Sequence, residues 1–325
     1  MKRFVLTVSL VFAALFPASA QRDSLLVMFW NLENFFDWTD GGQSASDAEF
    51  SPSGSRHWTP RRFYAKCNAV AKTILWTGDC CGRLPDAVGV AEVENEGVLR
   101  RLVYGTALYR YGYSYIHYDS PDPRGIDVGL IYRKQTMTPV SSRPVRIGDF
   151  PTRDILDAYM GTANGRLHLL VNHHPSKYGG AESAGRRMSA MRTLAELCDS
   201  LTAADSCGIV AVGDFNDTPD AEAFNLLKGR LDNLAEPLHA EGKGSIRYDG
   251  RWELIDMIMV SPAIKSEGME IVEPPFLMTK DSAHSGLKPL RTYTGPAYRG
   301  GVSDHLPVTC RVLVPAASAP LFDGK

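Results

Sequence analysis

Residues 302–309 read VSDHLPVT, and they place an acidic side chain, Asp304, beside an imidazole, His305, directly before an apolar segment. Residues 306–308 have the composition of the start of a buried strand. Burying a charged group next to apolar residues costs free energy unless the group has bonded partners. We therefore expect other parts of the chain to supply partners for Asp304 and His305.

Six further polar motifs adjoin apolar segments. Taken singly, each polar residue in them is more often a turn, cap or surface residue than a functional one. The motifs are FWNLENFFD with Asn31, VAEVEN with Glu92 and Glu94, RGIDVGLIYR with Asp127, LLVNHHPSK with His173, VGDFND with Asp214 and Asn216, and ELIDMIMVS with Asp256.

Together these residues have a coherent chemistry. Glu92, Asp304 and the amide oxygen of Asn31 are hard oxygen donors suited to Mg²⁺, Mn²⁺ or Ca²⁺. Two histidines can transfer a proton near neutral pH or hold a phosphoryl oxygen as imidazolium. The carboxylates of Asp127 and Asp256 can each orient one histidine ring. This set of groups indicates metal-assisted hydrolysis of a phosphate ester.

Strand-like and helix-like segments alternate along the chain. Apolar runs predict strands at 25–30, 87–93, 113–118, 127–132, 154–160, 166–172, 208–212, 252–260, 269–272 and 306–313, and helical spacing predicts helices at 62–76, 97–108 and 183–201. With so many strands and so few helices, a layered α/β sandwich is favoured over an all-parallel doubly wound sheet. The polar motifs fall at or just beyond strand ends, where functional loops gather.

Taken in chain order, from FWNLENFFD to VSDHLPVT, the seven motifs resemble those of the endonuclease/exonuclease/phosphatase superfamily, which has the DNase I-like fold. The resemblance runs from about residue 26 to 314, and GDFND and SDHLPV are its most specific parts. The stretch LRTYTGPAYRGGVSDHLPV is also similar to a secreted bacterial branch of the family. The resemblance implies an α/β four-layer sandwich, in which two mixed β-sheets pack face to face with helices on the outside.

The resemblance also implies the metal ligands. Glu92 would be the principal ligand, with Asn31 and Asp304 beside it, and Mg²⁺ would be the cofactor, with Mn²⁺ or Ca²⁺ as possible substitutes. Glu94 would support the structure behind these ligands.

The histidines would act on the phosphate. By resemblance, His173 and His305 flank the scissile phosphate, Asp127 supports His173, and Asp256 supports His305. The family pattern places the catalytic histidine directly after the asparagine of VNHHPSK, which selects His173 over His174.

Asp214 and Asn216 would contact the phosphate or orient the attacking water. The implied reaction is a single in-line displacement at phosphorus. Asp214 or His305 would help to deprotonate or place the water.

The first twenty residues have the pattern of a secretory signal. Lys2 and Arg3 precede an apolar run at 4–16, and Ala18-Ser19-Ala20 follows as a cleavage site. We expect residues 21–325 to form a single domain with a short Pro/Ala-rich tail from about 315, in a secreted or periplasmic protein. Of the six cysteines, Cys198 and Cys207 are the first candidate disulfide pair, because such bonds form in oxidising compartments.

The substrate is less determined than the reaction. Without Lys2 and Arg3 the chain has 33 basic and 37 acidic residues, and a protein that grips long nucleic acid usually has a basic surplus. We expect a secreted nuclease acting on DNA or RNA as an endo- or exonuclease. The alternatives are a phosphodiesterase or phosphatase acting on lipid head groups or small phosphate esters, and an exported binding protein without turnover.

Three segments are candidates for recognising the rest of the substrate. They are 38–58, the loop at 177–180 with Arg186 and Arg187, and 280–299. The last has cations and aromatic residues that could hold phosphates and stack a base, and it is equally well explained as a solvated surface loop. No amphipathic membrane-binding segment is evident in the mature chain, and we expect a monomer without stable membrane insertion.

Overall fold

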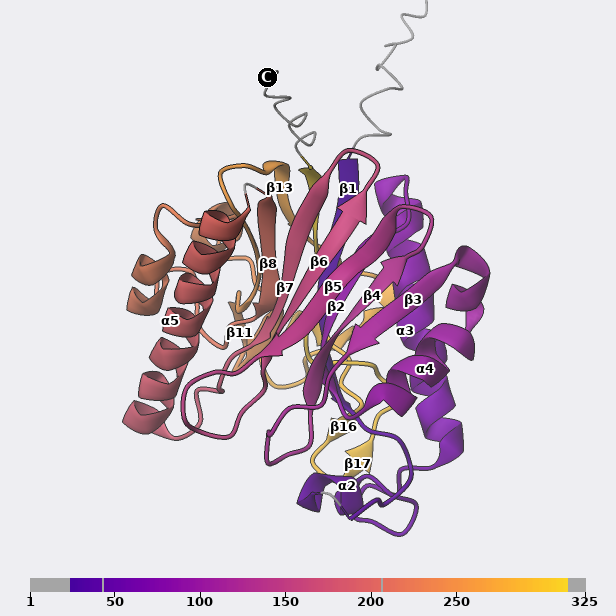
Figure 1. Cartoon of the computed structure of the whole chain (residues 1–325). Coiled ribbons are helices and arrows are strands. Elements are labelled where there is room, and N and C mark those ends of the chain that lie inside the picture. The colour runs from indigo at the N-terminus through magenta and orange to yellow at the C-terminus, as the bar shows by residue number, and fades with distance from the viewer. Residues whose placement is uncertain (1–23, 43, 206, 315–325) are drawn as a thin grey trace, which may run out of the picture.

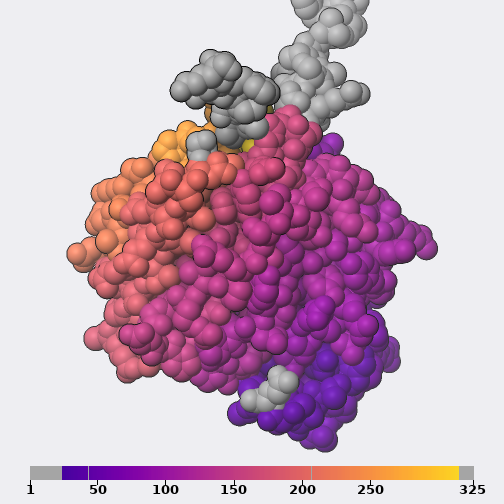
Figure 2. All heavy atoms as spheres, viewed as in Figure 1, coloured from indigo at the N-terminus to yellow at the C-terminus, as the bar shows by residue number. Residues whose placement is uncertain are grey.

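The computed structural model describes residues 24–42, 44–205 and 207–314. The signal segment predicted at 1–20 and the tail expected from about 315 lie outside the described residues. Figure 1 shows two large sheets packed together with helices at the flanks, and Figure 2 shows the same face of the molecule with all heavy atoms drawn.

Both large sheets have six strands and mixed directions. The first has the order β13 (Lys265–Ile271), β18 (Val308–Leu313), β1 (Ser24–Phe35), β2 (Ala87–Val93), β4 (Asp127–Arg133) and β3 (Tyr113–His117). The second has the order β5 (Met137–Val145), β6 (Ile155–Thr162), β7 (Arg166–His173), β8 (Gly208–Asp214), β12 (Asp256–Val260) and β9 (Asp232–Asn233).

Each sheet contains one parallel pair at its centre. β1 is parallel to β2 and β7 is parallel to β8, whereas all other neighbours in the two sheets are antiparallel. Parallel neighbours need a long crossover connection. The helix α3 (Pro60–Cys81) lies between β1 and β2 in the chain, and α5 (Gly180–Ala204) lies between β7 and β8.

The two sheets pack face to face, and β1 is apolar on both sides because both of its faces are buried. Val27 and Phe29 belong to the core that the two sheets share, whereas Met28 and Trp30 face the core beneath α3. At the sheet interface, a Cβ on Gly89 of β2 would lie 2.7 Å from Val212 Cγ2 of β8. Glycine at this position therefore allows the sheets to approach closely.

The helices lie on the outer faces of the sheets. α3 and α4 (Glu96–Tyr104) flank the first sheet, and α5 flanks the second (Figure 1). The α/β sandwich of two mixed sheets with outer helices is thus confirmed. Within the described residues, no helix is both long and apolar enough to cross a membrane.

The smaller elements connect these layers. They are the helices α2 (Ala45–Glu49) and α6 (Glu236–Ala240), the 3₁₀ turns Ala107–Tyr111, Glu222–Leu227 and Pro275–Leu277, and the hairpins β10 (Ile246–Tyr248) with β11 (Arg251–Glu253), β14 (Met278–Lys280) with β15 (Leu287–Pro289), and β16 (Tyr293–Thr294) with β17 (Ala297–Tyr298).

Three of the differences from the prediction alter the elements themselves and not only their end residues. The helix expected at 97–108 ends at Tyr104, because Gly105 caps it and Thr106 starts a separate 3₁₀ turn. The strand expected at 252–260 is divided into β11 and β12. β5 was not predicted, because it is a mostly exposed edge strand that lacks a periodic apolar pattern.

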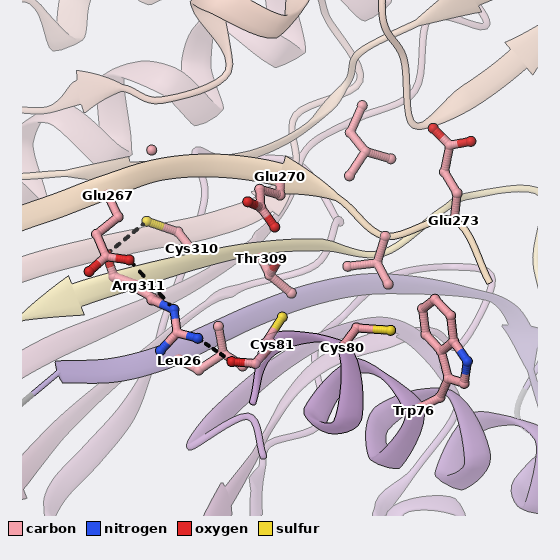
Figure 3. A pocket seen from close by; sticks show the side chains of 13 residues that line it. Leu26, Trp76, Cys80, Cys81, Glu267, Glu270, Glu273, Thr309, Cys310 and Arg311 are labelled. Carbon is pink, nitrogen blue, oxygen red and sulfur yellow. Dashed lines mark hydrogen bonds and ion pairs between the residues drawn. The ribbon is translucent and has the colours of Figure 1, made fainter. Parts of the chain in front are cut away.

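The disulfide expected between Cys198 and Cys207 is not present. All six cysteines are free thiols, and Cys207 Sγ instead donates to Asp205 Oδ2 at 3.0 Å. Cys80 and Cys81 at the end of α3 border a cavity of about 360 Å³, together with Cys310 of β18 (Figure 3).

Candidate active site

The polar motifs meet at one edge of the sandwich because of strand direction. The parallel strands β1, β2, β7 and β8 reach this edge near their C-terminal ends, and β12 and β18 start there because they run the opposite way. Open α/β sheets bind ligands beyond the carboxyl ends of their strands. The register therefore brings Asp256 opposite Asp214, and His173 beside Asp214.

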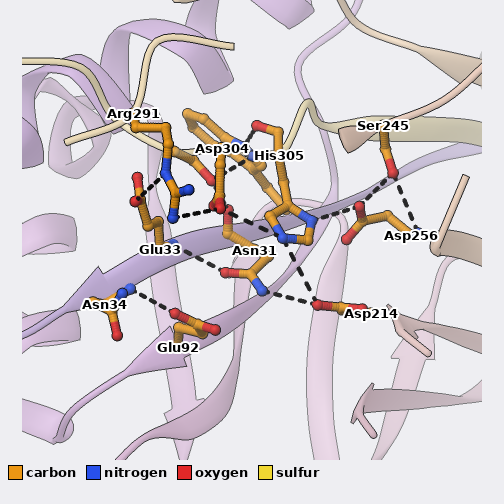
Figure 4. A network of polar contacts seen from close by, with 12 residues as sticks. Asn31, Glu33, Asn34, Glu92, Asp214, Ser245, Asp256, Arg291, Asp304 and His305 are labelled. Atoms are coloured by element: carbon orange, nitrogen blue, oxygen red, sulfur yellow. Dashed lines mark hydrogen bonds and ion pairs between the residues drawn. The ribbon is translucent and has the colours of Figure 1, made fainter. Parts of the chain in front are cut away.

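His305 is held by a buried carboxylate. Its Nδ1 lies 2.7 Å from Asp256 Oδ2, and that oxygen also accepts a hydrogen bond from Ser245 Oγ at 2.5 Å (Figure 4). Burial alone would favour neutral imidazole, but Asp256, with Asp304 and Asp214 nearby, raises the pKa of His305 well above its usual value. The structure thus pairs His305 with Asp256, as expected, and favours the imidazolium form.

The backbone around His305 is also fixed. Its N–H donates to Ser303 Oγ at 3.0 Å, and this hydroxyl donates in turn to the carbonyl oxygen of Asn31 at 2.6 Å. The indole of Trp30 donates to the carbonyl oxygen of His305 at 2.9 Å. β1 and the segment before β18 therefore position the imidazole together.

Asp214 lies at the centre of the site. Asn31 Nδ2 donates to its Oδ2 at 3.0 Å, and the N–H of Asn216 donates to its Oδ1 at 2.9 Å. His305 Nε2 lies 4.0 Å from Asp214 Oδ2. Burial, with Asp256 close by, raises the pKa of Asp214 to about 7, so this carboxylate can exchange a proton near neutral pH.

The two adjacent histidines have different surroundings. His173 Nε2 lies 3.7 Å from Asp214 Oδ2 and 3.9 Å from Glu92 Oε1, whereas the ring of His174 packs against Phe215 and neither of its nitrogens has a hydrogen-bond partner. Burial and nearby arginines lower the pKa of His173 well below its usual value, and burial lowers that of His174 to about 3. His173 therefore faces the reacting groups as neutral imidazole, and His174 packs behind it.

Asp127 does not support His173. Its Oδ2 lies 3.1 Å from His117 Nε2, and its Oδ1 accepts from the N–H and the hydroxyl of Ser120. The expected pairing is wrong because His117, on the neighbouring strand β3, reaches Asp127 within the same sheet. His173 Nδ1 is buried without a hydrogen-bond partner.

Glu92 is held by a loop and an arginine. The N–H of Asn34 donates to Glu92 Oε2 at 2.7 Å, and Arg124 Nη2 lies 3.4 Å from the same oxygen. Burial opposes the charged form, yet Arg124 and the bond from Asn34 lower the pKa of Glu92 below its usual value. Glu92 is therefore a carboxylate at neutral pH.

Asp304 belongs to a second charge cluster. Arg291 Nη2 lies 2.9 Å from Asp304 Oδ2, and Arg291 Nε donates to Glu33 Oε1 at 2.9 Å (Figure 4). The buried ammonium of Lys66 donates to the carbonyl oxygen of Glu33 and to Thr292 Oγ1. Burial lowers the pKa of Lys66 to about 8, although Glu33, Glu92 and Asp304 favour its charge.

Strained backbone gathers at the site. Four of the seven described non-glycine residues with positive φ lie here, namely Glu33 at 46°, Asn34 at 47°, Glu92 at 60° and Asn216 at 50°. Such conformations cost about 1–3 kcal/mol each and persist where the surrounding structure enforces them. Glu94, the other acid of VAEVEN, accepts from the N–H of Asp37 at 2.6 Å and so anchors the loop after β1.

The donor set suits a divalent cation. Asn31, Glu92 and Asp304 offer oxygen atoms, and the charges of Glu92 and Asp304 both act on Lys66 and on Arg291. Both carboxylate side chains keep an exposed part, 12% for Glu92 and 20% for Asp304. Hard cations take carboxylate and amide oxygens in such partly solvated positions.

Two groups among the described residues also place three potential ligand atoms within 4.8 Å of one another. They are Asp214 with Asp256 and His305, and His117 with Asp119 and Asp127. In the first group, Asp256 and His305 are already bonded to each other, so these side chains function better as a proton-holding pair than as ligands.

Five charged or titratable residues around the site were not singled out from the sequence, namely Glu33, Lys66, His117, Arg124 and Arg153. Arg153 is one of the arginines that lower the pKa of His173. Glu33 lies in FWNLENFFD, so a broader reading of that motif would have found it. Lys66 and the two arginines have no sequence signal, because a cation on a helix or loop is usually solvated.

Solved structures share the fold. A Bacteroides thetaiotaomicron endonuclease/exonuclease/phosphatase family protein is 17% identical with a TM-score of 0.59, covering 89% of this chain and 97% of its own. A mannosyl-6-phosphatase from the same organism is 16% identical (TM-score 0.59, 89% and 99%), and Danio rerio TDP2 complexed with a single-strand DNA product is 14% identical (0.56, 89% and 98%). Comparison with curated protein sequences gave no match.

The sequence comparison with protein families agrees with the fold. Residues 26–313, which include all seven motifs, match the profile of the endonuclease/exonuclease/phosphatase family. The chain is therefore a member of the endonuclease/exonuclease/phosphatase family, whose members hydrolyse phosphoric esters.

Proposed function

We propose that the protein is an exported, Mg²⁺-dependent phosphodiesterase that hydrolyses DNA or RNA. The observation that carries this proposal is the meeting of an oxygen-donor set with two differently protonated histidines at one edge of the sandwich. The donor set is Asn31, Glu92 and Asp304, and the histidines are His173 and His305. The export signal is a sequence inference.

Each of these residues has a separate role at the reacting phosphate. His305, kept as imidazolium by Asp256, donates a hydrogen bond to a phosphoryl oxygen that gains negative charge, and neutral His173 contacts the phosphate from the side of Glu92. Asp214, whose pKa is about 7, accepts a proton from the attacking water, and Asn216 helps to place that water. When bound at Asn31, Glu92 and Asp304, Mg²⁺ supplies Lewis-acid stabilisation of the phosphoryl oxygens.

A second candidate is a phosphatase or phosphodiesterase that acts on small phosphate esters. Two observations favour it. The mature chain has more acidic than basic residues, and one protein of the same fold is described as a mannosyl-6-phosphatase. TDP2, which is described with a DNA product, favours the nuclease to the same extent, because each likeness is one of fold alone.

One assay separates these functions. The purified mature protein is incubated with Mg²⁺, Mn²⁺ or Ca²⁺ and with plasmid DNA, RNA, sphingomyelin, inositol phosphates or bis(p-nitrophenyl) phosphate, with EDTA as the control. EDTA-sensitive cleavage of DNA or RNA is the expected result. Turnover of small esters alone selects the second candidate, and a complete lack of turnover would refute both in favour of a binding protein.

A further inference from the structure

A cavity of about 380 Å³ lies beside the candidate active site. Its walls come from the loops at 122–124 and 150–153 and from the start of α5, with Arg124, Arg186 and Tyr178 among the lining side chains. The segment 175–176, which follows the two adjacent histidines, also lines it.

The cavity shares its wall with the reacting groups. Arg124 Nη2 donates to Asn34 Oδ1 at 2.9 Å and lies 3.4 Å from Glu92 Oε2. On the other wall, Arg153 Nη2 donates to the carbonyl oxygen of His174 at 2.5 Å. A substrate whose reacting phosphate lies at Glu92 and His173, and which extends beyond that phosphate, would therefore place its next group in the cavity.

The cavity lining carries three arginines, Arg124, Arg153 and Arg186, against two carboxylates, Asp122 and Glu182. Arg153 Nη1 is paired with Asp122 Oδ2 at 2.9 Å, and the lining keeps one positive charge in surplus. α5 has 25 residues and begins at Gly180, and its N-cap Gly179 provides no side-chain hydrogen bond to the first turn. Free N–H groups and the helix dipole favour a negative charge there. Arg186 adds a cation whose guanidinium lies over the Phe150 ring at 5.4 Å, and it is paired with the exposed Glu182 at 2.5 Å.

Two buried polar atoms in the cavity wall lack partners. Thr152 is 3% exposed and its Oγ1 has no hydrogen-bond partner, and the same holds for Nε of Arg153, which is 6% exposed. Buried polar atoms are rarely left unsatisfied in folded proteins. Both atoms are buried, so a ligand in the cavity would satisfy them only if the two side chains turned toward it.

We propose that this cavity binds a second phosphoryl group of the substrate, adjacent to the one that reacts. The inference rests on the proposed function and narrows its substrate class to molecules with at least two phosphates. The second phosphate can be the next diester of a polynucleotide or a further phosphate on a small ester, and both would contact Arg124, Arg186 and the N–H groups of α5.

Turnover of matched substrates, with and without a second phosphate, tests the proposed second phosphate site. The kcat/KM of a dinucleotide is compared with that of the same dinucleotide carrying an added 5′- or 3′-phosphate, and a singly phosphorylated inositol is compared with a doubly phosphorylated one. We expect a preference for the second phosphate that Arg186→Gln reduces about tenfold, mainly through KM. Glu182→Gln should increase the preference by freeing Arg186, and the nucleotide and inositol arms distinguish the two sources.

Arg192→Gln is the control, because Arg192 is an exposed arginine of the same helix outside the cavity lining. It should leave the preference unchanged. An equal loss in Arg192→Gln and Arg186→Gln, or no preference in the unmodified protein, would overturn the proposal.

A binding measurement separates this proposal from the proposed function. Isothermal titration calorimetry in EDTA compares the 5′-phosphorylated dinucleotide with the unphosphorylated one, and Arg186→Gln should weaken only the added affinity. If bis(p-nitrophenyl) phosphate is not hydrolysed but this difference is found, the hydrolase is wrong and the second phosphate site stands. If bis(p-nitrophenyl) phosphate is hydrolysed but the two dinucleotides bind equally well, the hydrolase stands and the second phosphate site is wrong.

Discussion

Replacing Asp256 by asparagine tests the imidazolium assignment of His305. Asp256 is fully buried, and its Oδ2 is bonded to His305 Nδ1 at 2.7 Å and to Ser245 Oγ at 2.5 Å. Asparagine has nearly the same shape but no charge. The substitution therefore removes the ion pair while keeping the packing.

The size of the effect follows from these contacts. A hydrogen bond between charged groups contributes about 1.5–3 kcal/mol, which corresponds to about 10- to 150-fold in turnover if the pair holds His305 in the transition state. Removing one partner of a buried ion pair lowers the free energy of unfolding by about 3–5 kcal/mol. Both turnover and stability should fall.

The stability loss should depend on pH. Because the folded protein raises the pKa of His305, the pair stabilises the native state fully below the unfolded pKa of about 6.5, and this stabilisation is lost as pH rises through the folded pKa. In the Asp256→Asn variant, burial is opposed only by the weaker charges of Asp304 and Asp214, so protonation of His305 at low pH no longer stabilises the fold as it does in the unmodified protein. Urea unfolding should therefore show a larger difference between the two proteins at pH 6 than at pH 9.

Asp157→Asn is a matched control. Asp157 Oδ1 lies 2.7 Å from His168 Nδ1, and both side chains are buried on β6 and β7 outside the candidate site. This variant should lose stability and keep its turnover on bis(p-nitrophenyl) phosphate, measured well below its unfolding temperature. Near-normal turnover in Asp256→Asn, or an equal loss in Asp157→Asn, would refute the role of the pair.

Three further predictions follow from the geometry. His173→Ala should lower turnover about 10²- to 10⁴-fold, whereas His174→Leu should change it less than about threefold, because neither nitrogen of His174 is bonded; steady-state kinetics on purified variants decides. EDTA should abolish turnover, and Glu92→Gln should raise the Mg²⁺ concentration needed to restore it at least about tenfold in a metal titration; an unchanged requirement would remove Glu92 from the ligand set. Gly89→Ala should lower the free energy of unfolding by about 1–3 kcal/mol in urea, because its Cβ would lie 2.7 Å from Val212 Cγ2.

The strands were predictable because their residues are apolar on both faces. β2 was predicted with its observed bounds, Ala87–Val93, since both of its faces are buried in this sandwich. β5 escaped prediction because only its first residue is buried, so no apolar pattern marks it. A run of apolar residues therefore predicts a strand that is buried on both faces, but it gives no signal for an exposed edge strand such as β5.

Partners of the site residues were less predictable than their positions. Asp256 is the first residue of β12, which is antiparallel to β8, and Asp127 is the first residue of β4, which is antiparallel to β2. Because β8 and β2 end at the site, both aspartates lie at the same edge. Which histidine each one reaches depends on the neighbouring strand. Asp256 lies on β12, which contacts β1 and β18 of the other sheet, and it reaches His305. Asp127 instead has β3 beside it and bonds His117.

Arg291 and Lys66 explain how Asp304 of VSDHLPVT can stand among other carboxylates. Glu33, Glu92 and Asp304 bring several carboxylates to one small region, and like charges there would raise the free energy of the folded state. Lys66 from α3 and Arg291 from the segment between β15 and β16 place two cations among them, and Arg291 bonds Glu33 and Asp304 directly. α3 is the crossover that the parallel pair β1 and β2 requires, so the same topology that aligns the strand ends also delivers the buried cation. Asp304 and His305 can therefore stand side by side because one faces this cation cluster and the other faces Asp256.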